Sequence, residues 1–373
     1  MRYHFAFDMR QIRLHLLFLI SVAVLLGAAA PQSYGQEIES VYGPLPIFEF
    51  HSGFWVNLHH FLYHEARARQ AAKEQREPGG KSLSPVLRQT PGSTVSLSTA
   101  EQKLWDDAIA YYISNYAMKD MQINIDLILL KDQLGDFEDC NELTGKKRPS
   151  CDAGLPGNEG AVLESVAGIY RAHWWTDHNR ANRRWVIGVA PLVREQGVGL
   201  SERLAEIYQS KWPKEKIRVE VCAFANSAGA YTTLDPLHVT IASTDPRNQG
   251  TEALGVLFYE SSHGLALPVQ NAISRECRQR EKPIPRNLWH ALIYYTTTEV
   301  IRPIISGSGT EVPSGGPSNV QKPRFSSLPG ELKGNLTQRG WEDYLHVIIT
   351  FWQPYLDGRV NFEDAIAHMV SAI

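Results

Sequence analysis

The strand-like segments constrain the fold most, because they occupy one short region in the middle of the chain. Residues 216–226 alternate Val and Ile with charged residues, and a second extended run covers 238–243. On both sides of this region the apolar residues recur at helical spacing. The predicted helices cover 47–71, a segment opening at Ser98, 160–180, 182–194, 251–267, 287–303, 339–356 and 361–372. We therefore predict a helix-rich α+β protein with a small central sheet.

Local chemistry predicts where some of these helices begin and end. Ser98 is followed three residues later by Glu101, the pattern of a capping box that opens a helix. Pro268 is expected to stop the helix that begins near Thr251. Segments rich in Pro, Gly and Ser, about 76–96 and 306–330, are predicted loops.

The N-terminal segment has the order of zones that a secretory signal peptide requires. Arg10 and Arg13 precede the apolar run 14–30, and small and polar residues follow as far as Gln36. We predict a signal peptide over 1–35 and one domain over 36–373, in a secreted or periplasmic protein. The alternative is a retained membrane anchor, since the apolar run is near the lower limit for a span. No later segment is long and apolar enough, so we expect no stable membrane insertion after signal removal.

Composition excludes two broad classes of protein. The chain is 43% hydrophobic and 21% charged, which supplies a substantial core and argues against disorder. Its formal net charge is -3, so a concentrated basic face is not indicated and we expect no nucleic-acid partner.

The chain has 4 cysteines, an even number in a protein expected to be exported. Cys140 and Cys151 enclose a short polar loop, and Cys222 and Cys277 form the remaining pair. An oxidising compartment favours two disulfides, Cys140–Cys151 and Cys222–Cys277. For the second pair, buried free thiols are the alternative.

The most suggestive residues lie in the predicted helix 251–267. Tyr259 and His263 are four residues apart and share a helix face, with Glu260 beside them. A zinc hydrolase needs two ligands one helical turn apart and a carboxylate directly after the first ligand. Glu260 and His263 fit these positions, and Tyr259 occupies the place of the first ligand.

Here the chain resembles the zincin metallopeptidases, in particular the gluzincin branch, whose helix carries His-Glu-x-x-His. The segment Tyr259-Glu260-Ser261-Ser262-His263 departs from that motif at the first His, and the resemblance covers about residues 216–303. It implies zinc as the cofactor and Glu260 as the general base. It also implies metal positions at Tyr259, His263 and, on a later helix, Glu299.

His290 competes with Glu299 for the role of third ligand. The two residues are half a turn out of phase on a straight helix, so both can hardly face one metal. If Glu299 is the ligand, His290 or a tyrosine such as Tyr294 would instead stabilise an oxyanion.

A second histidine group precedes these segments. His60 and His64 are one helical turn apart, His59 is adjacent and His51 lies upstream, a spacing that can bind copper or zinc. Aromatic residues surround them, which favours histidines that make hydrogen bonds inside the protein.

Two functions are consistent with the sequence. The first is an exported gluzincin-like metallopeptidase, degenerate or weakly active at its metal site, with a peptide or protein substrate. The alternative is a non-catalytic exported binding protein that uses the same cleft.

Overall fold

The computed structural model describes residues 45–75, 95–138, 140, 143, 155, 158–307 and 340–373. The predicted signal peptide and its cleavage point lie outside the described residues, as do Cys151 and most of the two predicted loops. The described part of the chain is helix-rich with a small mixed sheet, which confirms the predicted α+β class. None of its helices has the length and apolar character needed to cross a bilayer.

The sheet has four strands in the order β1-β2-β4-β3 within the described residues. Strands β1, β2 and β4 run parallel, and β3 pairs antiparallel with β4 at one edge. The bounds are β1 Phe48–His51, β2 Ile217–Cys222, β3 Ala230–Leu234 and β4 Leu237–Ala242. The two predicted strands are confirmed as β2 and β4. Two strands were not predicted from the sequence pattern. Strand β1 is short and directly precedes a helix, and β3 lies in a segment rich in turn residues.

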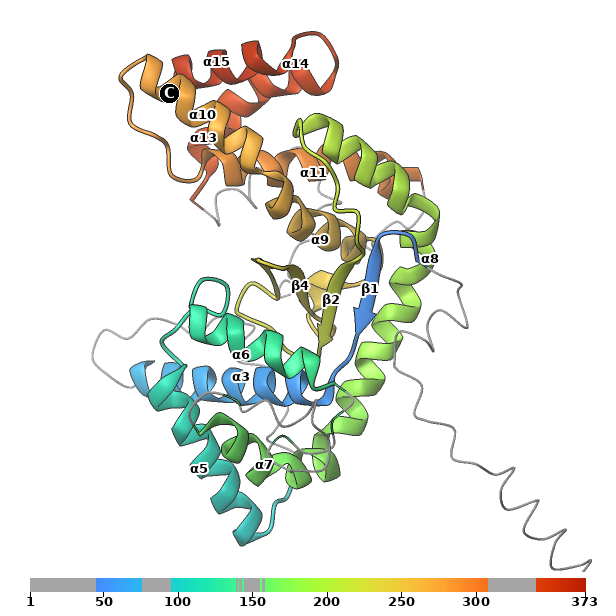
Figure 1. The fold of residues 1–373 in the computed structure, drawn as a ribbon, viewed down its shortest axis with the longest axis vertical. Helices are drawn as coiled ribbons and strands as arrows, with labels where there is room; N and C mark the ends of the chain where they lie inside the picture. The colour runs from blue at the N-terminus through green and yellow to red at the C-terminus, as the bar shows by residue number, and fades with distance from the viewer. Residues whose placement is uncertain are drawn as a thin grey trace, which may run out of the picture.

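One set of helices lies below the sheet in Figure 1, at the end where β1 and β2 finish. These helices are α3 Phe54–Gln75, α5 Thr99–Asn115, α6 Ile125–Asp136 and α7 Glu159–Tyr170. The capping box predicted at Ser98 is present, with Ser98 and Glu101 bonding each other's backbone N–H groups. A cluster of buried residues from these helices forms one core, which Cys222, Phe224 and Tyr231 join from the sheet.

Helix α8, Thr176–Ile207, connects the lower helices to the rest of the molecule along one side of the sheet (Figure 1). It continues α7 through a π-helical turn, η3, at Arg171–Trp175. The two helices predicted over 160–180 and 182–194 are therefore parts of one continuous helical run.

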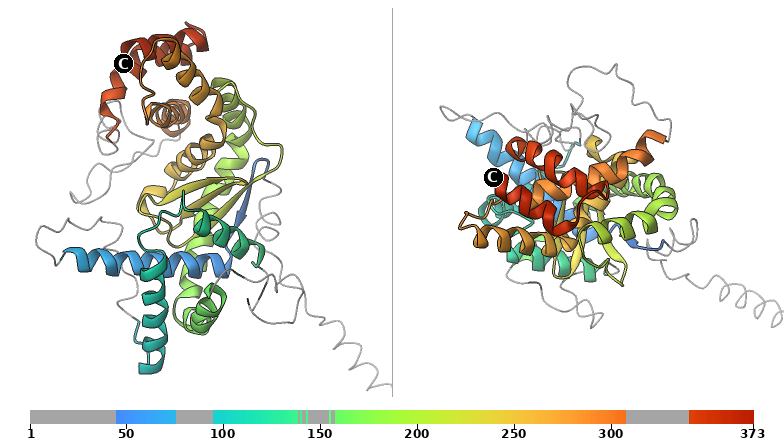
Figure 2. Two further views of the ribbon diagram at one scale, coloured as in Figure 1. Left: turned by 60° about the vertical axis from the view of Figure 1, so that its left-hand side comes forward. Right: turned by 90° about the horizontal axis from the view of Figure 1, so that it is seen from above.

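The remaining helices lie above the sheet, as Figure 2 shows from a second side. They are α9 Thr251–Ser262, α10 Leu267–Gln279, α11 Leu288–Gly307, α13 Glu342–Val347, α14 Gln353–Leu356 and α15 Phe362–Ala372, with short turns η5 His263–Leu265 and η6 Ile348–Trp352. A further short turn, η4 Pro246–Asn248, follows the carboxyl end of β4 and precedes α9. The prediction that Pro268 ends the helix from Thr251 is wrong. Helix α9 ends at Ser262, and Pro268 stands in the first turn of α10, where its missing N–H leaves no hydrogen bond unmade.

One face of the sheet is apolar, and the other carries both polar and apolar side chains. Val219, Val221, Val239 and Ile241 are buried in a second core, together with apolar residues of α8, α9 and α11. The alternate residues, which include Arg218 and Glu220, point to the opposite face. The same second face also contributes Cys222 and Tyr231 to the core formed by the helices below the sheet.

The predicted disulfide between Cys222 and Cys277 is wrong, because both residues are buried free thiols. Cys222 ends β2 and packs in the core formed with the helices below the sheet, which we call the lower core. Cys277 lies on α10 and packs in the second core, on the other face of the sheet, which we call the upper core. Cys140 is disulfide-bonded, and its predicted partner Cys151 lies outside the described residues.

Candidate functional site

The candidate site is built at the end of a helix that is buried on every side. Helix α9 is buried from Glu252 to Ser262, as its dense apolar sequence requires. Tyr259 and Glu260 lie in its last turn, and His263 follows in η5. Next to them, Gly264 packs against Leu237, the first residue of β4. The site therefore lies at the amino end of β4.

One ring nitrogen of His290, Nε2, is contacted by the side chains of both Tyr259 and His263. The phenol oxygen of Tyr259 lies 2.6 Å from Nε2 of His290, and Nε2 of His263 lies 3.0 Å from the same nitrogen. His290 comes from the first turn of α11, and its ring stacks on that of Tyr259 with the planes only 6° apart. The tertiary structure thus joins the two helices that the sequence analysis singled out.

The tautomer of His263 follows from its second contact. Its Nδ1 lies 3.1 Å from the backbone carbonyl of Glu260, and a carbonyl oxygen only accepts hydrogen bonds. Nδ1 therefore donates its proton, and in the neutral ring the lone pair is on Nε2, which is directed at His290. A backbone carbonyl that holds the Nδ1 proton is a frequent partner of metal-binding histidines, because it fixes the ring and its basicity.

Glu260 is held beside this cluster by β3. The hydroxyl of Thr232 lies 2.8 Å from Oε2 of Glu260 and 2.8 Å from its carbonyl oxygen. The same Oε2 is 3.7 Å from Nδ1 of His263. The Glu260 carboxylate therefore lies on the Nδ1 side of the imidazole, opposite the nitrogen that faces His290.

Aromatic rings enclose the three converging side chains. Tyr294 packs edge-on against Tyr259, with ring centroids 5.3 Å apart, and Trp289 stacks on His290 at 4.9 Å. Trp341, just before α13, lies 4.6 Å from the His290 ring. Tyr294, which the sequence suggested as an oxyanion donor, thus packs its ring against Tyr259 as part of this aromatic wall.

The structure does not bring Glu299 to this cluster. Glu299 lies further along α11 and forms an ion pair of 2.6 Å with Arg302. Burial raises the pKa of Glu299, and the nearby Arg302 guanidinium opposes that shift. His290 thus occupies the third position, which the resemblance assigned to Glu299.

Among the described residues, no group of three or more His, Cys, Asp or Glu side chains is placed to hold a metal ion. The cluster has only two such residues, His263 and His290, and its third polar group is the phenol of Tyr259. The Tyr259 phenolate could therefore act only as a third protein ligand beside these two histidines.

The histidines of α3 are hydrogen-bonded inside the lower core. His60 contacts the Val56 carbonyl at 2.7 Å and the Tyr231 hydroxyl at 2.8 Å, and His59 contacts the Tyr112 hydroxyl at 2.9 Å. Burial lowers the pKa of His60 to about 4, although its bond to the Val56 carbonyl opposes the shift. The pairing of these rings supports the hydrogen-bonding interpretation over a metal site.

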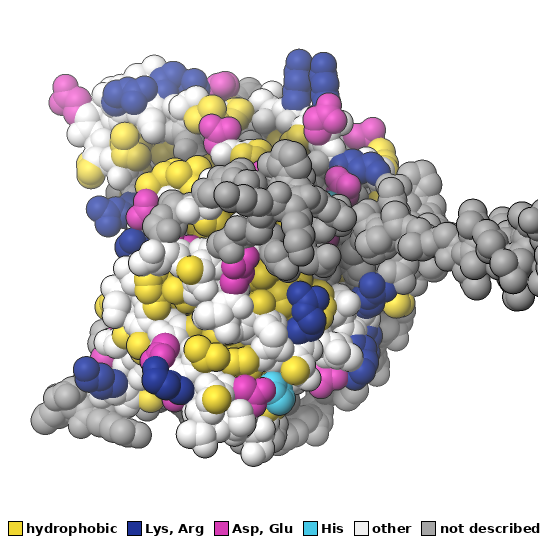
Figure 3. Space-filling model, turned by 60° about the horizontal axis from the view of Figure 1, so that its bottom comes forward, with side chains coloured by type: hydrophobic (Ala, Val, Ile, Leu, Met, Phe, Trp, Pro, Cys, Tyr) yellow, Lys and Arg dark blue, Asp and Glu magenta, His cyan; other side chains and the backbone are white. Residues whose placement is uncertain are grey.

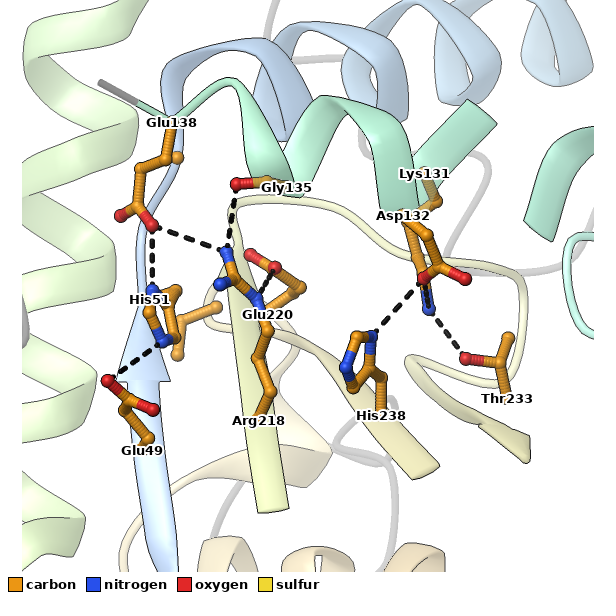
Figure 4. A network of polar contacts seen from close by, with 12 residues as sticks. Glu49, His51, Lys131, Asp132, Gly135, Glu138, Arg218, Glu220, Thr233 and His238 are labelled. Carbon is orange, nitrogen blue, oxygen red and sulfur yellow. Dashed lines mark hydrogen bonds and ion pairs between the residues drawn. The ribbon is translucent and has the colours of Figure 1, made fainter. Parts of the chain in front are cut away.

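His51 belongs to a second polar network, which the sequence analysis missed (Figure 4). Its Nδ1 lies 2.7 Å from the carboxylate of Glu138, which also contacts Arg218 at 3.2 Å. Arg218 in turn bonds Glu220 at 2.5 Å on the polar face of the sheet. The alternation of charged residues along β2 was the available signal, but their partners come from a distant part of the chain.

The same network continues under α6. The ammonium group of Lys131 lies 2.6 Å from the Thr233 hydroxyl and 3.2 Å from Asp132, whose carboxylate also contacts His238 at 3.2 Å. Burial lowers the pKa of Lys131, and the charge of Asp132 acts in the opposite direction. These contacts attach α6 to the sheet.

The surface shows charges of both signs. On the lower face of the molecule, Lys and Arg side chains lie between Asp and Glu and exposed hydrophobic side chains (Figure 3).

No protein-family model matches the chain, and neither a curated protein nor a solved structure matches it. The functional interpretation therefore depends on the residues themselves.

Proposed function

We propose that Tyr259, His263 and His290 bind one transition-metal ion, with zinc as the first candidate, at a degenerate gluzincin-like site of an exported protein. The convergence of the Tyr259 oxygen and the His263 nitrogen on Nε2 of His290 carries this proposal. The N-terminal sequence pattern supports export.

The distances suit a shared ion. Two nitrogens bound to tetrahedral zinc at their usual bond length lie roughly 3.3 Å apart. The separation of 3.0 Å between the His263 and His290 nitrogens is close to that value. The Tyr259 oxygen, 2.6 Å from the His290 nitrogen, is closer than two ligands of one zinc ion would be and would have to move outward to bind the same ion.

The positions of the protons in the cluster allow a second interpretation, in which no metal is bound. If Nε2 of His290 accepts the Tyr259 proton, then its contact with His263 brings two lone pairs together. If Nε2 of His290 carries a proton, it donates that proton in a hydrogen bond to Nε2 of His263 instead. Either one metal ion or one proton shared between the two histidine nitrogens therefore accounts for these contacts. A measurement of metal binding distinguishes the two possibilities.

The residues present favour weak hydrolysis at most. A bound zinc ion would polarise a water molecule or a peptide carbonyl. Tyr259 would have to lose its phenol proton to bind, although the reference pKa of this group is about 10. Glu260 would act as general base, but its carboxylate is held by Thr232 on the far side of His263. This placement also favours the second function, a binding protein that keeps the cleft without efficient catalysis.

Zinc titration of the purified protein tests the proposal. We expect saturable binding of one equivalent by the wild type, and at least a tenfold loss of affinity in His263→Ala and in His290→Ala. Glu299→Gln is the matched control and should bind zinc like the wild type, because its ion pair lies outside the cluster. Thermal unfolding of each variant verifies that it is folded.

Two results would overturn parts of the proposal. Absence of saturable zinc binding by the wild type would leave the shared proton as the correct interpretation. Peptide hydrolysis with a kcat/KM above about 10⁴ M⁻¹s⁻¹, the range of ordinary enzymes, would show that the site is not degenerate.

A further inference from the structure

A pocket separate from the proposed metal site lies at the opposite end of the sheet. It has a volume of about 210 Å³ and is lined by Tyr63, His64, Arg67, Met118, Lys119, Asp120, Ala225, Asn226 and Ser227. The last three of these follow β2 directly, so the pocket adjoins the carboxyl end of a parallel strand. In open sheets with parallel strands, this is the edge at which ligands bind.

The walls of the pocket are fixed by contacts between separate segments. The Tyr63 hydroxyl donates to the carbonyl of Lys119 at 2.7 Å, and Arg67 donates to the carbonyl of Ala117 at 2.7 Å. Both bonds join α3 to the connection between α5 and α6. On another side, the buried ring of His64 stacks on Phe224, with centroids 4.4 Å apart. The pocket is therefore part of the folded framework.

Arg67 provides the charge that a ligand would need. A guanidinium group has five N–H donors, and the bond to Ala117 is the one hydrogen bond of the Arg67 side chain among the described residues. Lys119 also lines the pocket, but its ammonium group is paired with Asp126 at 3.2 Å. Arg67 is thus the available cation, and its planar fork suits a carboxylate.

The polar groups across the pocket complement that cation. Asn226 uses its side-chain oxygen to accept the N–H of Ala228 at 3.0 Å, which leaves its amide N–H groups as donors. Ser227 adds an exposed hydroxyl. Asp120 lies on the rim, with one carboxylate oxygen accepting the N–H of Gln122 at 2.8 Å. Donors for an anion and an acceptor for an ammonium group therefore line one small space.

We propose that this pocket binds a small carboxylate of amino-acid size, with Arg67 as the residue that pairs with its carboxylate group. A volume of about 210 Å³ suits a small ligand such as a short dicarboxylic acid or a single amino acid. The proposal is independent of the metal site, which lies at the amino end of β4.

Isothermal titration calorimetry on the purified full chain tests this site with succinate, L-glutamate, inorganic phosphate and the uncharged succinamide. We expect saturable binding of succinate or glutamate and none of succinamide. Arg67→Gln should weaken that binding at least tenfold. The matched control is Arg69→Gln on the same helix, which removes an exposed ion pair with Asp106 and should leave binding unchanged.

A second variant keeps the test decisive if Arg67→Gln fails to fold. Ser227→Trp replaces an exposed residue of the pocket lining and should block the pocket without removing a core contact. The proposal is overturned if neither carboxylate binds, if phosphate binds in preference to both, or if Ser227→Trp binds as the wild type does. Zinc binding should be equal in the wild type and Arg67→Gln, which separates failure of this proposal from failure of the metal site.

Discussion

The Thr232 hydroxyl on β3 lies 2.8 Å from the carboxylate of Glu260 on α9, so the edge strand of the sheet supports the acidic residue of the candidate site. The next residue of the strand, Thr233, points to the opposite face and accepts a hydrogen bond from Lys131 on α6. Because side chains alternate along a strand, β3 connects the polar network under α6 with the cluster beside α9.

Removal of the Thr232 hydroxyl should destabilise the protein. Thr232→Val would leave the buried carboxylate of Glu260 without this donor, and we expect the free energy of unfolding to fall by about 1–3 kcal/mol. Urea unfolding measures the change. Thr232→Ser keeps the hydroxyl, removes only the methyl group and is the control. A Thr232→Val protein that is as stable as the wild type would contradict the contribution of this hydrogen bond.

Tyr259→His should raise zinc affinity. An imidazole is ready to bind a metal at neutral pH, whereas a phenol must first lose its proton. We expect at least a tenfold tighter dissociation constant in a competition titration with a zinc chelator. His263→Ala introduced into the variant should abolish the gain, because the second nitrogen of the cluster is then missing. A folded Tyr259→His protein with wild-type affinity would exclude a ligand set at this position.

Stability should fall in mild acid because the lower core holds neutral histidines. Burial lowers the pKa of His60 to about 4, and burial also lowers that of His178 to about 4. The unfolded chain has the ordinary value near 6.5, so between about pH 6.5 and 4 it binds more protons than the folded state. Stability is then present above pH 6.5 and decreases as the pH falls, by roughly 3 kcal/mol for each ring at the end of the range.

Denaturant unfolding at several pH values measures this dependence. His60→Gln removes one titrating ring, so its stability should decrease less between pH 7 and 5 than that of the wild type. The exposed His346 lies outside the lower core, and His346→Gln is the control, with the wild-type slope expected. Identical slopes in all three proteins would contradict the assignment to His60.

The two free thiols should react only in the unfolded protein. Burial raises the pKa values of Cys222 and Cys277, and both side chains are enclosed in the core. We expect a thiol reagent to label neither residue in the native protein and both in denaturant without reductant. Rapid labelling of either cysteine under native conditions would contradict the packing described here.

The local pattern of the sequence determined much of the architecture. Alternation of Val and Ile with charge predicted β2, and the pair of Ser98 and Glu101 predicted the start of α5, because these signals act over a few residues. The spacing of Tyr259, Glu260 and His263 likewise placed three candidate residues together within one predicted helix, 251–267, which in the structure ends at Ser262.

Tertiary structure decided what those local signals could not. The sequence left His290 and Glu299 as alternatives, and the packing of α11 on α9 brought His290 to His263 while Glu299 paired with Arg302. Strand β1 formed because Phe48 to His51 pair with β2, a partner that lies far along the chain. Cys222 and Cys277 ended in different cores. In each case the deciding contact joins residues distant in sequence, and the local pattern carries no information about such a partner.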